Sequence, residues 1–187
     1  MTVEHCGPLW SVGSDERIWR LTLTQIHSPE DMRAYVDTAL REQKEGKALP
    51  FVVIEKSSGT VVGSTRYGNI DMTHRRVEIG WTWYNPQWQR TAVNTETKFL
   101  LLTHAFERLG CIRVELKTDA LNQQSRRAIL RIGAKEEGIL RQHNVTPSGR
   151  LRDTVYFSII DSEWPEVKKS LVQKLRRRNN LPDRNIM

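Results

Sequence analysis

The sequence has only two cysteines, and no apolar run approaches the roughly 18 residues that a membrane span requires. Cys6 and Cys111 are too few for a disulfide framework, and neither has metal-ligating side chains near it in the sequence. The N-terminus also lacks the basic start and apolar stretch that are typical of a secretion signal. These absences predict a soluble cytoplasmic protein with no disulfide, no membrane contact and no metal site.

Acidic residues are too few to balance the basic ones, and the excess is concentrated near the C-terminus. The net charge is +7 over 187 residues, and the segment 165–187 holds seven Lys and Arg against Glu166 and Asp183. This distribution favours a helix end and a polar tail over a basic nucleic-acid-binding domain. We therefore predict one domain, residues 1–175, and a basic tail, residues 176–187. An RNA- or ribosome-associated role for residues 168–184 is the alternative.

Hydrophobic periodicity and turn residues predict strands and helices along the whole chain. Ser28 and Pro29 begin a helix, because serine can cap free N–H groups and proline suits the first turn. The predicted helices are 3–12, 29–43, 98–109, 123–132 and 163–178, and the predicted strands are 51–55, 61–67, 75–84, 112–118, 138–145 and 151–160. This order predicts an α/β fold with a mixed sheet and helices on both faces.

The most informative segment is the loop 86–96, which leads from a strand into an apolar helix. The helix is predicted to end at Gly110 and to place Phe99, Leu102, Phe106 and Leu109 on one face. The first turn of any helix has N–H groups without intrahelical partners, at the positive end of the helix dipole. Such a point attracts phosphate. An ordinary strand-to-helix loop is the alternative interpretation.

The same loop resembles the acyl-CoA pyrophosphate loop of the GNAT N-acetyltransferase superfamily, whose pattern is Gln/Arg-x-x-Gly-x-Gly/Ala. Gln89 matches the first position of that pattern. Ala92 and Asn94 stand where the family usually has Gly and Gly or Ala.

Two later segments strengthen the resemblance. Residues 119–125 are similar to the Asn-x-x-Ser segment that follows the fifth strand in many GNAT enzymes, and residues 131–138, RIGAKEEG, are similar to the turn after it. The likeness runs in order from about residue 51 to residue 160. It is closest to the RimJ/RimL-like branch, which contains ribosomal-protein N-terminal acetyltransferases.

The resemblance implies a mixed, mostly antiparallel sheet with a V-shaped split between the fourth and fifth strands. It also implies an acyltransferase that moves an acetyl group from acetyl-CoA to a primary amine by direct attack in a ternary complex. GNAT domains usually begin with a strand, but Met1 lies almost directly at the first predicted helix. We therefore expect that strand to be missing or truncated and the sheet edge to be weakened or paired differently.

The resemblance also implies how acetyl-CoA is held. Loop N–H groups would bind its diphosphate, and the fourth strand would pair with its pantetheine arm. Ala92 keeps most of the close backbone access that glycine provides, whereas Asn94 could cap the helix or contact phosphate itself. Arg90 would add a charge, or it is a solvated surface residue. The residues assigned to acetyl-CoA binding are Thr82, Trp83, Tyr84, Gln89, Arg90, Thr91, Ala92, Val93, Asn94, Thr95, Asn122 and Ser125.

Two residues are assigned to proton transfer. Glu78 shares a strand face with Gly80 and Thr82, so it could point into the cleft and act as a base, directly or through water. Its alternative is an exposed glutamate paired with Arg76 or a neighbour. Ser125 matches the family position proposed to protonate the departing thiolate, and its alternative is a solvated serine.

Further candidates are weaker. Asn122 could simply cap a helix instead of holding the pantetheine arm. His143 and Asn144 lie on a strand that could reach the same cleft, but Asn144 cannot act as an acid where related ribosomal-protein enzymes have one. His74 and His104 are predicted to be surface or packing residues.

The sequence leaves the acceptor amine and the oligomeric state open. A ribosomal protein or peptide is one acceptor class and a small-molecule amine is another. A homodimer through the terminal strands, or through the helix that carries Tyr35, is compatible with the pattern. A GNAT scaffold that binds CoA without turnover is the non-enzymatic alternative.

Overall fold

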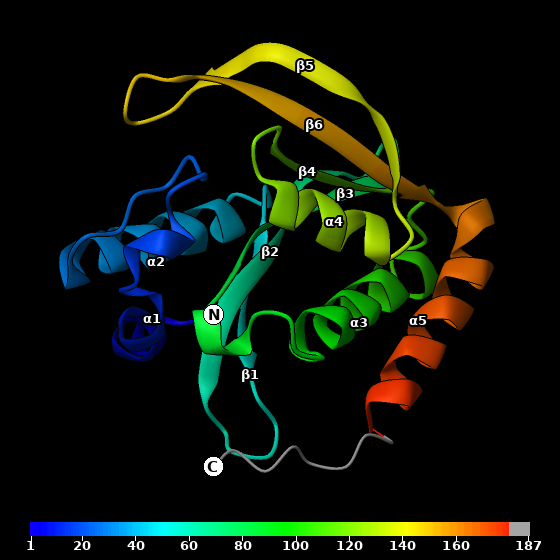
Figure 1. Cartoon of the computed structure of the whole chain (residues 1–187), viewed down its shortest axis with the longest axis horizontal. Helices are drawn as coiled ribbons and strands as arrows, with labels where there is room; N and C mark the ends of the chain where they lie inside the picture. The colour runs from blue at the N-terminus through cyan, green and yellow to red at the C-terminus, as the bar shows by residue number, and fades with distance from the viewer. Residues whose placement is uncertain (180–187) are drawn as a thin grey trace.

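The computed structural model describes residues 1–179, with the side chains of residues 1–177. A single six-stranded sheet lies between two groups of helices (Figure 1). The helices are α1 Cys6–Gly13, α2 Pro29–Lys44, α3 Val93–Glu107, α4 Gln123–Arg131 and α5 Trp164–Asn179. The strands are β1 Leu49–Ile54, β2 Val61–Asp71, β3 Arg76–Tyr84, β4 Arg113–Asp119, β5 Lys135–Val145 and β6 Leu151–Ile160. The predicted tail begins within α5, and its residues 180–187 lie outside the described residues.

The sheet has the strand order β1-β2-β3-β4-β6-β5 and is mostly antiparallel, as predicted. Only β3 and β4 are parallel, and their pairing covers just three positions, from Arg76 opposite Arg113 to Glu78 opposite Glu115. Beyond these pairs the two strands separate. Trp81, which has a φ of 49°, lies in β3 just beyond these pairs, where the pairing of β3 with β2 is also irregular. The predicted split is thus present, between the third and fourth strands of this chain.

The split lies between the third and fourth strands, and not between the fourth and fifth, because the usual first strand of the family is missing, as predicted. Residues 1–28 form α1 and short 3-10 turns, and no strand precedes α2 within the described residues. This leaves β1 at the edge of the sheet, where it pairs with β2. The Met1 ammonium group donates a hydrogen bond to the Pro50 carbonyl of β1 at 3.2 Å. One backbone group of the edge strand is thereby satisfied by the chain terminus.

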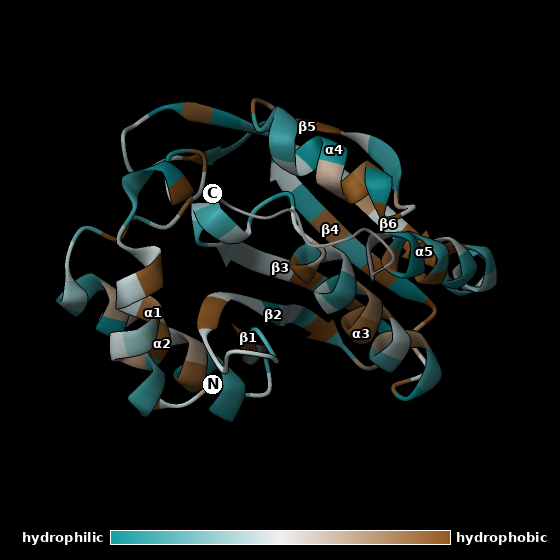
Figure 2. Cartoon of the chain, turned by 60° about the horizontal axis from the view of Figure 1, so that its bottom comes forward, coloured by the Kyte–Doolittle hydropathy of each residue, from teal (hydrophilic) through white to brown (hydrophobic). Residues whose placement is uncertain are grey.

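Two hydrophobic clusters hold the helices to the sheet. The larger cluster joins α3, α4 and α5 to the central strands and includes Leu102, Val114, Phe157 and Leu171, which are all fully buried. The smaller cluster joins α1 and α2 to β3 through Leu9, Trp19, Met32, Val36 and Trp83. Figure 2 shows the two helix groups apart from each other, each with brown, hydrophobic segments. The sheet is therefore covered by different helices on its two faces.

Helix α3 differs from its prediction in start and in orientation. It begins at Val93 instead of residue 98, and it ends at Glu107. Its buried positions are Thr95, Lys98, Leu101, Leu102 and Ala105. Leu109, which we predicted on the apolar face, lies beyond the helix and is 47% exposed. The inner face is therefore rotated relative to the predicted one: it includes Lys98 and Leu101, whereas Phe99 and Phe106 are only half-buried.

Candidate active site

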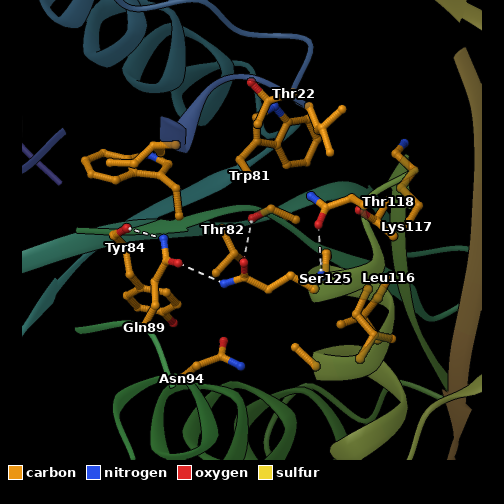
Figure 3. Close-up of a pocket in the computed structure, with 18 of the residues that line it drawn as sticks. Thr22, Trp81, Thr82, Tyr84, Gln89, Asn94, Leu116, Lys117, Thr118 and Ser125 are labelled. Atoms are coloured by element: carbon orange, nitrogen blue, oxygen red, sulfur yellow. Dashed lines mark hydrogen bonds between the residues drawn. The ribbon is translucent and has the colours of Figure 1, made fainter. Parts of the chain in front are cut away.

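A cavity of about 1110 Å³ opens where β3 and β4 separate. Its walls come from β3, β4, the start of α3, the first turns of α4 and the segment between α1 and α2. Figure 3 shows Thr82, Asn94 and Ser125 directed into this space from three different elements. The predicted site residues that line the cavity are Glu78, Thr82, Trp83, Tyr84, Gln89, Arg90, Thr91, Asn94, Asn122 and Ser125. Ala92, Val93 and Thr95 do not line it.

Gln89 connects the end of β3 to the start of α4. Its Nε2 donates to the Tyr84 carbonyl at 3.1 Å, and its Oε1 accepts from Nε2 of Gln124 at 2.8 Å (Figure 3). The next residue, Arg90, has a φ of 62°, in the left-handed region that glycine adopts most easily. The chain therefore has at Arg90 a backbone conformation suited to glycine, together with a cationic side chain that lines the cavity.

The N-terminus of α3 carries no side-chain cap. Ala92 is the N-cap residue, and its methyl group cannot accept a hydrogen bond from the first turn. The Val93 N–H donates only a long bond, 3.3 Å, to Oγ1 of Thr91. The buried Thr95 hydroxyl accepts from the Arg131 guanidinium of α4 at 3.0 Å. The first turn thus presents backbone N–H groups near the cavity, and an arginine of α4 is fixed beside it.

Helix α4 begins with the side-chain cap that we considered for Asn122. Its Oδ1 accepts from the Ser125 backbone N–H at 2.9 Å. This bond uses the carbonyl oxygen of Asn122 and leaves its amide N–H groups available to the cavity. Ser125, three residues later, is half-buried and lines the same cavity. Capping and a cavity role are therefore compatible at this position.

Glu78 is buried, with 3% of its surface exposed. Its Oε2 accepts from Nδ2 of Asn69 at 2.6 Å and forms an ion pair with Nζ of Lys117 at 2.9 Å. The alternative of an exposed glutamate paired with Arg76 is wrong, because Arg76 pairs with Asp71 and Glu115 instead. Strand pairing explains the difference, since Asp71 lies opposite Arg76 in β2 and Glu115 lies two residues after its partner Arg113 in β4.

Sequence reasoning missed Lys98, which is buried in the cavity wall. Its Nζ donates to Oγ1 of Thr82 at 2.7 Å, and Thr82 lies 2.8 Å from Oγ1 of Thr65. Burial lowers the pKa of Lys98 to about 7, although the nearby charge of Glu78 acts in the opposite direction. The signal was present: a lysine three residues from Leu101 and four from Leu102 lies on the helix face that should be apolar.

The aromatic side chains of β3 have different surroundings. Trp83 is buried against α1 and α2, where its Nε1 donates to the Tyr35 hydroxyl at 3.3 Å. Trp81 is 37% exposed and stacks over the Arg66 guanidinium at 4.9 Å. A Cβ at Gly68 would lie 2.3 Å from the Trp81 ring, so only glycine leaves room for this ring. Both side chains line the cavity, and Trp83 in addition holds α1 and α2 against β3.

The histidines lie away from this cavity. His74 and His104 are exposed, His74 beside Asp71 and His104 stacked on Tyr67, as predicted. His143 is exposed on β5 and contacts the Tyr156 ring. Within residues 1–179, no cluster of three His, Cys, Asp or Glu side chains could hold a metal ion. Among the described helices, none has both the length and the apolar character needed to cross a bilayer.

Known proteins share this architecture. Residues 1–135 match the family model for the acetyltransferase (GNAT) domain. The structure of a GCN5-related N-acetyltransferase from Brucella melitensis is 34% identical, with a TM-score of 0.85 over 92% of this chain and 78% of that one. RimJ from Mycobacterium smegmatis, solved in complex with CoA-disulfide, is 21% identical, with a TM-score of 0.78 over 93% of this chain and 86% of that one.

The sequence of a curated bacterial protein is also similar. The ribosomal-protein-serine acetyltransferase of Escherichia coli strain K12 is 24% identical over 163 residues, which are 85% of this chain and 89% of that protein. The family model covers well over half of the chain, and the fold matches that of a solved structure of a GCN5-related N-acetyltransferase. The chain therefore belongs to the GNAT acetyltransferase family and is an acyltransferase with the mixed α/β fold of that family.

Proposed function

We propose that this protein transfers an acetyl group from acetyl-CoA to a primary amine by direct attack in a ternary complex. The observation that carries the proposal is the uncapped N-terminus of α3 beside the cavity at the split between β3 and β4. Acetyl-CoA supplies an acetyl group that is activated as a thioester. The acceptor is either the α-amine of a protein N-terminus or the amine of a small molecule.

The residues around α3 fit the diphosphate of acetyl-CoA. Backbone N–H groups from Arg90 to Thr95 would hold it together with the helix dipole. Arg90, Arg127 and Arg131 line this part of the cavity, and guanidinium groups bind phosphate oxygens well. Asn94 also lines the cavity, and its amide would contact phosphate. The RimJ structure solved with CoA-disulfide supports this assignment, because it has the same fold.

The pantetheine arm would lie along the separated part of β3. Thr82, Trp83 and Tyr84 follow the last position at which β3 pairs with β4, so their backbone groups are not used between those two strands. The amide N–H groups of Asn122 would hold the arm from the opposite side. The Tyr84 carbonyl is already bonded to Gln89, which leaves Thr82 and Trp83 as the better backbone partners.

Two residues would move protons. An α-amine with a pKa of about 8 is partly neutral at physiological pH, whereas a lysine amine with a pKa of about 10.4 needs a base. Glu78, on the cavity wall, would accept the proton of the attacking amine, directly or through water. Ser125 would donate a proton to the departing thiolate. Lys117 and Asn69 hold the Glu78 carboxylate in place.

Binding and turnover test the proposal separately. Acetyl-CoA should raise the melting temperature of the protein, and a thiol-release assay with mixed amines should show acceptor-dependent CoA formation. Stabilisation without thiol release would instead identify a non-catalytic CoA-binding scaffold. No stabilisation by acetyl-CoA would refute both, and it would favour the RNA- or ribosome-associated alternative. In that case, deletion of the residues after Leu175 should abolish salt-dependent RNA binding.

A ribosomal-protein N-terminus is the second candidate acceptor. It is favoured by the similarity to the E. coli ribosomal-protein-serine acetyltransferase. Such a substrate would also place this protein in the cytoplasm. Incubation of the protein with acetyl-CoA and purified ribosomal proteins, followed by mass spectrometry of their N-termini, tests this candidate directly.

A further inference from the structure

Arg152 of β6 is buried, and its guanidinium makes no hydrogen bond to any described residue. It is 7% exposed, lines the cavity, and its Nε has no hydrogen-bond partner within the described part of the chain. Burying an unsatisfied cationic group is costly, so such a side chain needs a partner from outside the protein. Burial also lowers the pKa of Arg152, as expected of a poorly compensated guanidinium.

The nearest carboxylate does not satisfy Arg152. Its Nε lies 3.9 Å from Oδ2 of Asp119, which is too long for a hydrogen bond. That oxygen is already bound by the guanidinium of Arg150, and the other oxygen of Asp119 accepts from the Leu121 N–H at 2.9 Å. Arg150 thus occupies the carboxylate that would otherwise pair with Arg152. The guanidinium of Arg152 is therefore left without a hydrogen-bond partner among the described residues, on the wall of the cavity.

Arg152 lies on β6, which pairs with β4 on the side away from β3. On β6 it shares a face with Tyr156, whose ring contacts Nζ of Lys117 at 5.8 Å. Lys117 in turn pairs with Glu78, and Arg152 is near enough to Glu78 to interact with it electrostatically. The proposed base and the unsatisfied arginine therefore belong to the same part of the cavity.

The charges of the cavity wall have one sign almost throughout. Glu78 is its only acidic residue among those described, whereas eight basic residues line it. Arg90, Arg127 and Arg131 match the phosphates of acetyl-CoA. The other five are Arg17, Arg20, Lys98, Lys117 and Arg152, and they also line the cavity. Such an environment repels polycationic amines and attracts anions.

We propose that the acceptor of this enzyme is a primary amine that also carries a carboxylate, and that Arg152 binds this carboxylate while Glu78 faces the amine. This inference rests on the proposed acetyl transfer. The planar guanidinium matches a carboxylate with two parallel hydrogen bonds. A doubly charged phosphate would be repelled more strongly by Asp119 and Glu78, so a carboxylate is the better partner. Arg152 is then a specificity-determining residue for the acceptor.

Paired acceptors test the assignment on the full-length protein. Each pair differs only in carboxylate against carboxamide: a free amino acid and its amide, and a peptide with Asp or Asn at its second position. The wild-type enzyme should prefer the carboxylate member by about 10-fold or more in kcat/KM, the usual effect of one charged hydrogen bond. Arg152→Gln should remove this preference by raising the KM for the carboxylate acceptors. The kcat/KM for the carboxamide acceptors and the KM for acetyl-CoA should stay unchanged.

Three controls keep the test specific. Arg152→Lys retains the positive charge but cannot form two parallel hydrogen bonds to a carboxylate, so it should keep part of the preference. Arg141→Gln removes the same charge at an exposed position of β5 and should keep all of it. Melting temperatures show whether each variant is folded. A preference limited to free amino acids identifies a small-molecule acceptor, and one limited to peptides identifies an acidic protein N-terminus; both support the proposal.

Other outcomes overturn it. Equal activity on both members of every pair, equal losses on both in Arg152→Gln, or preferred acetylation of a polyamine would each show that Arg152 does not select the acceptor. Calorimetric titration of the amino acids into the enzyme measures binding without turnover. If acetyl transfer fails but a carboxylate-bearing amine binds wild type and not Arg152→Gln, only the proposed function is wrong. If neither is seen, the carboxylate assignment fails as well.

Discussion

At the scale of single residues, the cavity wall contains several polar groups that are buried more deeply than an ordinary surface cleft would require. Lys98, Glu78 and Arg152 are each at least nine-tenths buried and come from three different elements. Each loses hydration on folding, and each is compensated to a different degree. Lys98 has a single hydroxyl partner, and Glu78 has an amide and an ammonium group. Arg152 has only a long ion pair with Asp119, and its Nε has no hydrogen-bond partner among the described residues.

Lys98 should make stability depend on pH. Its pKa falls from 10.5 to about 7 on folding because of burial, so between these values the unfolded chain binds a proton that the folded protein lacks. The free energy of unfolding should therefore rise as pH increases from about 7 toward 10.5. The cost of burying the Lys98 charge is greatest below pH 7. We expect Lys98→Met to be more stable than wild type near pH 6 and to lose that advantage by pH 10.

Melting temperatures of both proteins across this range check the prediction. Lys44→Met, at an exposed position of α2, is the matched control and should show no such trend. A difference between Lys98→Met and wild type that stays constant with pH would mean that Lys98 keeps its charge in the folded protein.

Ser125 is expected to act on turnover. Ser125→Ala removes the hydroxyl that would protonate the departing thiolate, while the Asn122 cap, which bonds the backbone N–H of residue 125, is retained. We therefore expect kcat to fall by about 10-fold or more, with little change in the KM for acetyl-CoA. Steady-state kinetics with acetyl-CoA as the varied substrate measure both. Equal losses in kcat and in affinity would instead assign Ser125 a positioning role.

At the scale of elements, the structure depends on how α3 begins. Ala92 gives this helix no side-chain cap, so its first turn is stabilised less by the chain itself than that of α2, which has a full capping box from Ser28 and Asp31. The same feature explains why the start of α3 was placed five residues too late from the sequence. A helix that begins without Ser, Thr, Asp or Asn gives no start signal.

The uncapped turn leads to a prediction with two opposite effects. Asn94→Asp places an anion in the first turn of α3, where it complements the helix dipole but repels phosphate. We expect the melting temperature of the free protein to stay the same or rise, and the KM for acetyl-CoA to increase by about 10-fold. Gln173→Glu, an exposed position on α5, is the matched control and should change neither. An unchanged KM in Asn94→Asp would show that the turn does not contact acetyl-CoA.

The sequence predicted regular elements well and the site less completely, for physical reasons. Hairpin turns and the caps of α2 and α4 are local, so Gly59, Gly149, Ser28 and Asn122 predict them from their neighbours alone. The surroundings of Glu78 depend on Asn69 and Lys117, which reach it through strand pairing and not through sequence proximity. Trp81 has a backbone conformation in the left-handed region, which the sequence of an aromatic-rich strand does not indicate.

At the scale of the whole molecule, the distribution of charge is more informative than the net value. The segment 165–187 explains most of the +7, yet the cavity wall is itself strongly basic. These basic residues come from the segment after α1, the loop before α3, α3 itself, β4, α4 and β6, so only the folded chain brings them together. The sequence therefore indicated a weakly charged domain where the structure has a concentrated positive field.

This field predicts that substrate binding is sensitive to salt. Raising the NaCl concentration from about 50 mM to about 500 mM shortens the screening length from roughly 14 Å to 4 Å, which weakens attraction between the cavity and anions. We expect the KM for acetyl-CoA to increase several-fold with a much smaller change in kcat. Replacing chloride by a neutral osmolyte of equal osmolality is the control and should leave the KM unchanged. A salt-independent KM would indicate that the phosphates lie outside the basic wall.

The short pairing of β3 and β4 has a consequence for the energy of binding. A continuous sheet satisfies its main-chain N–H and C=O groups between its own strands, whereas strands that part after three positions leave some of these groups inside the molecule without a neighbouring ladder. An elongated ligand with amide groups along its length can complete that ladder as an added strand would. Affinity gained in this way depends on backbone atoms and tolerates many side-chain substitutions along the two strands.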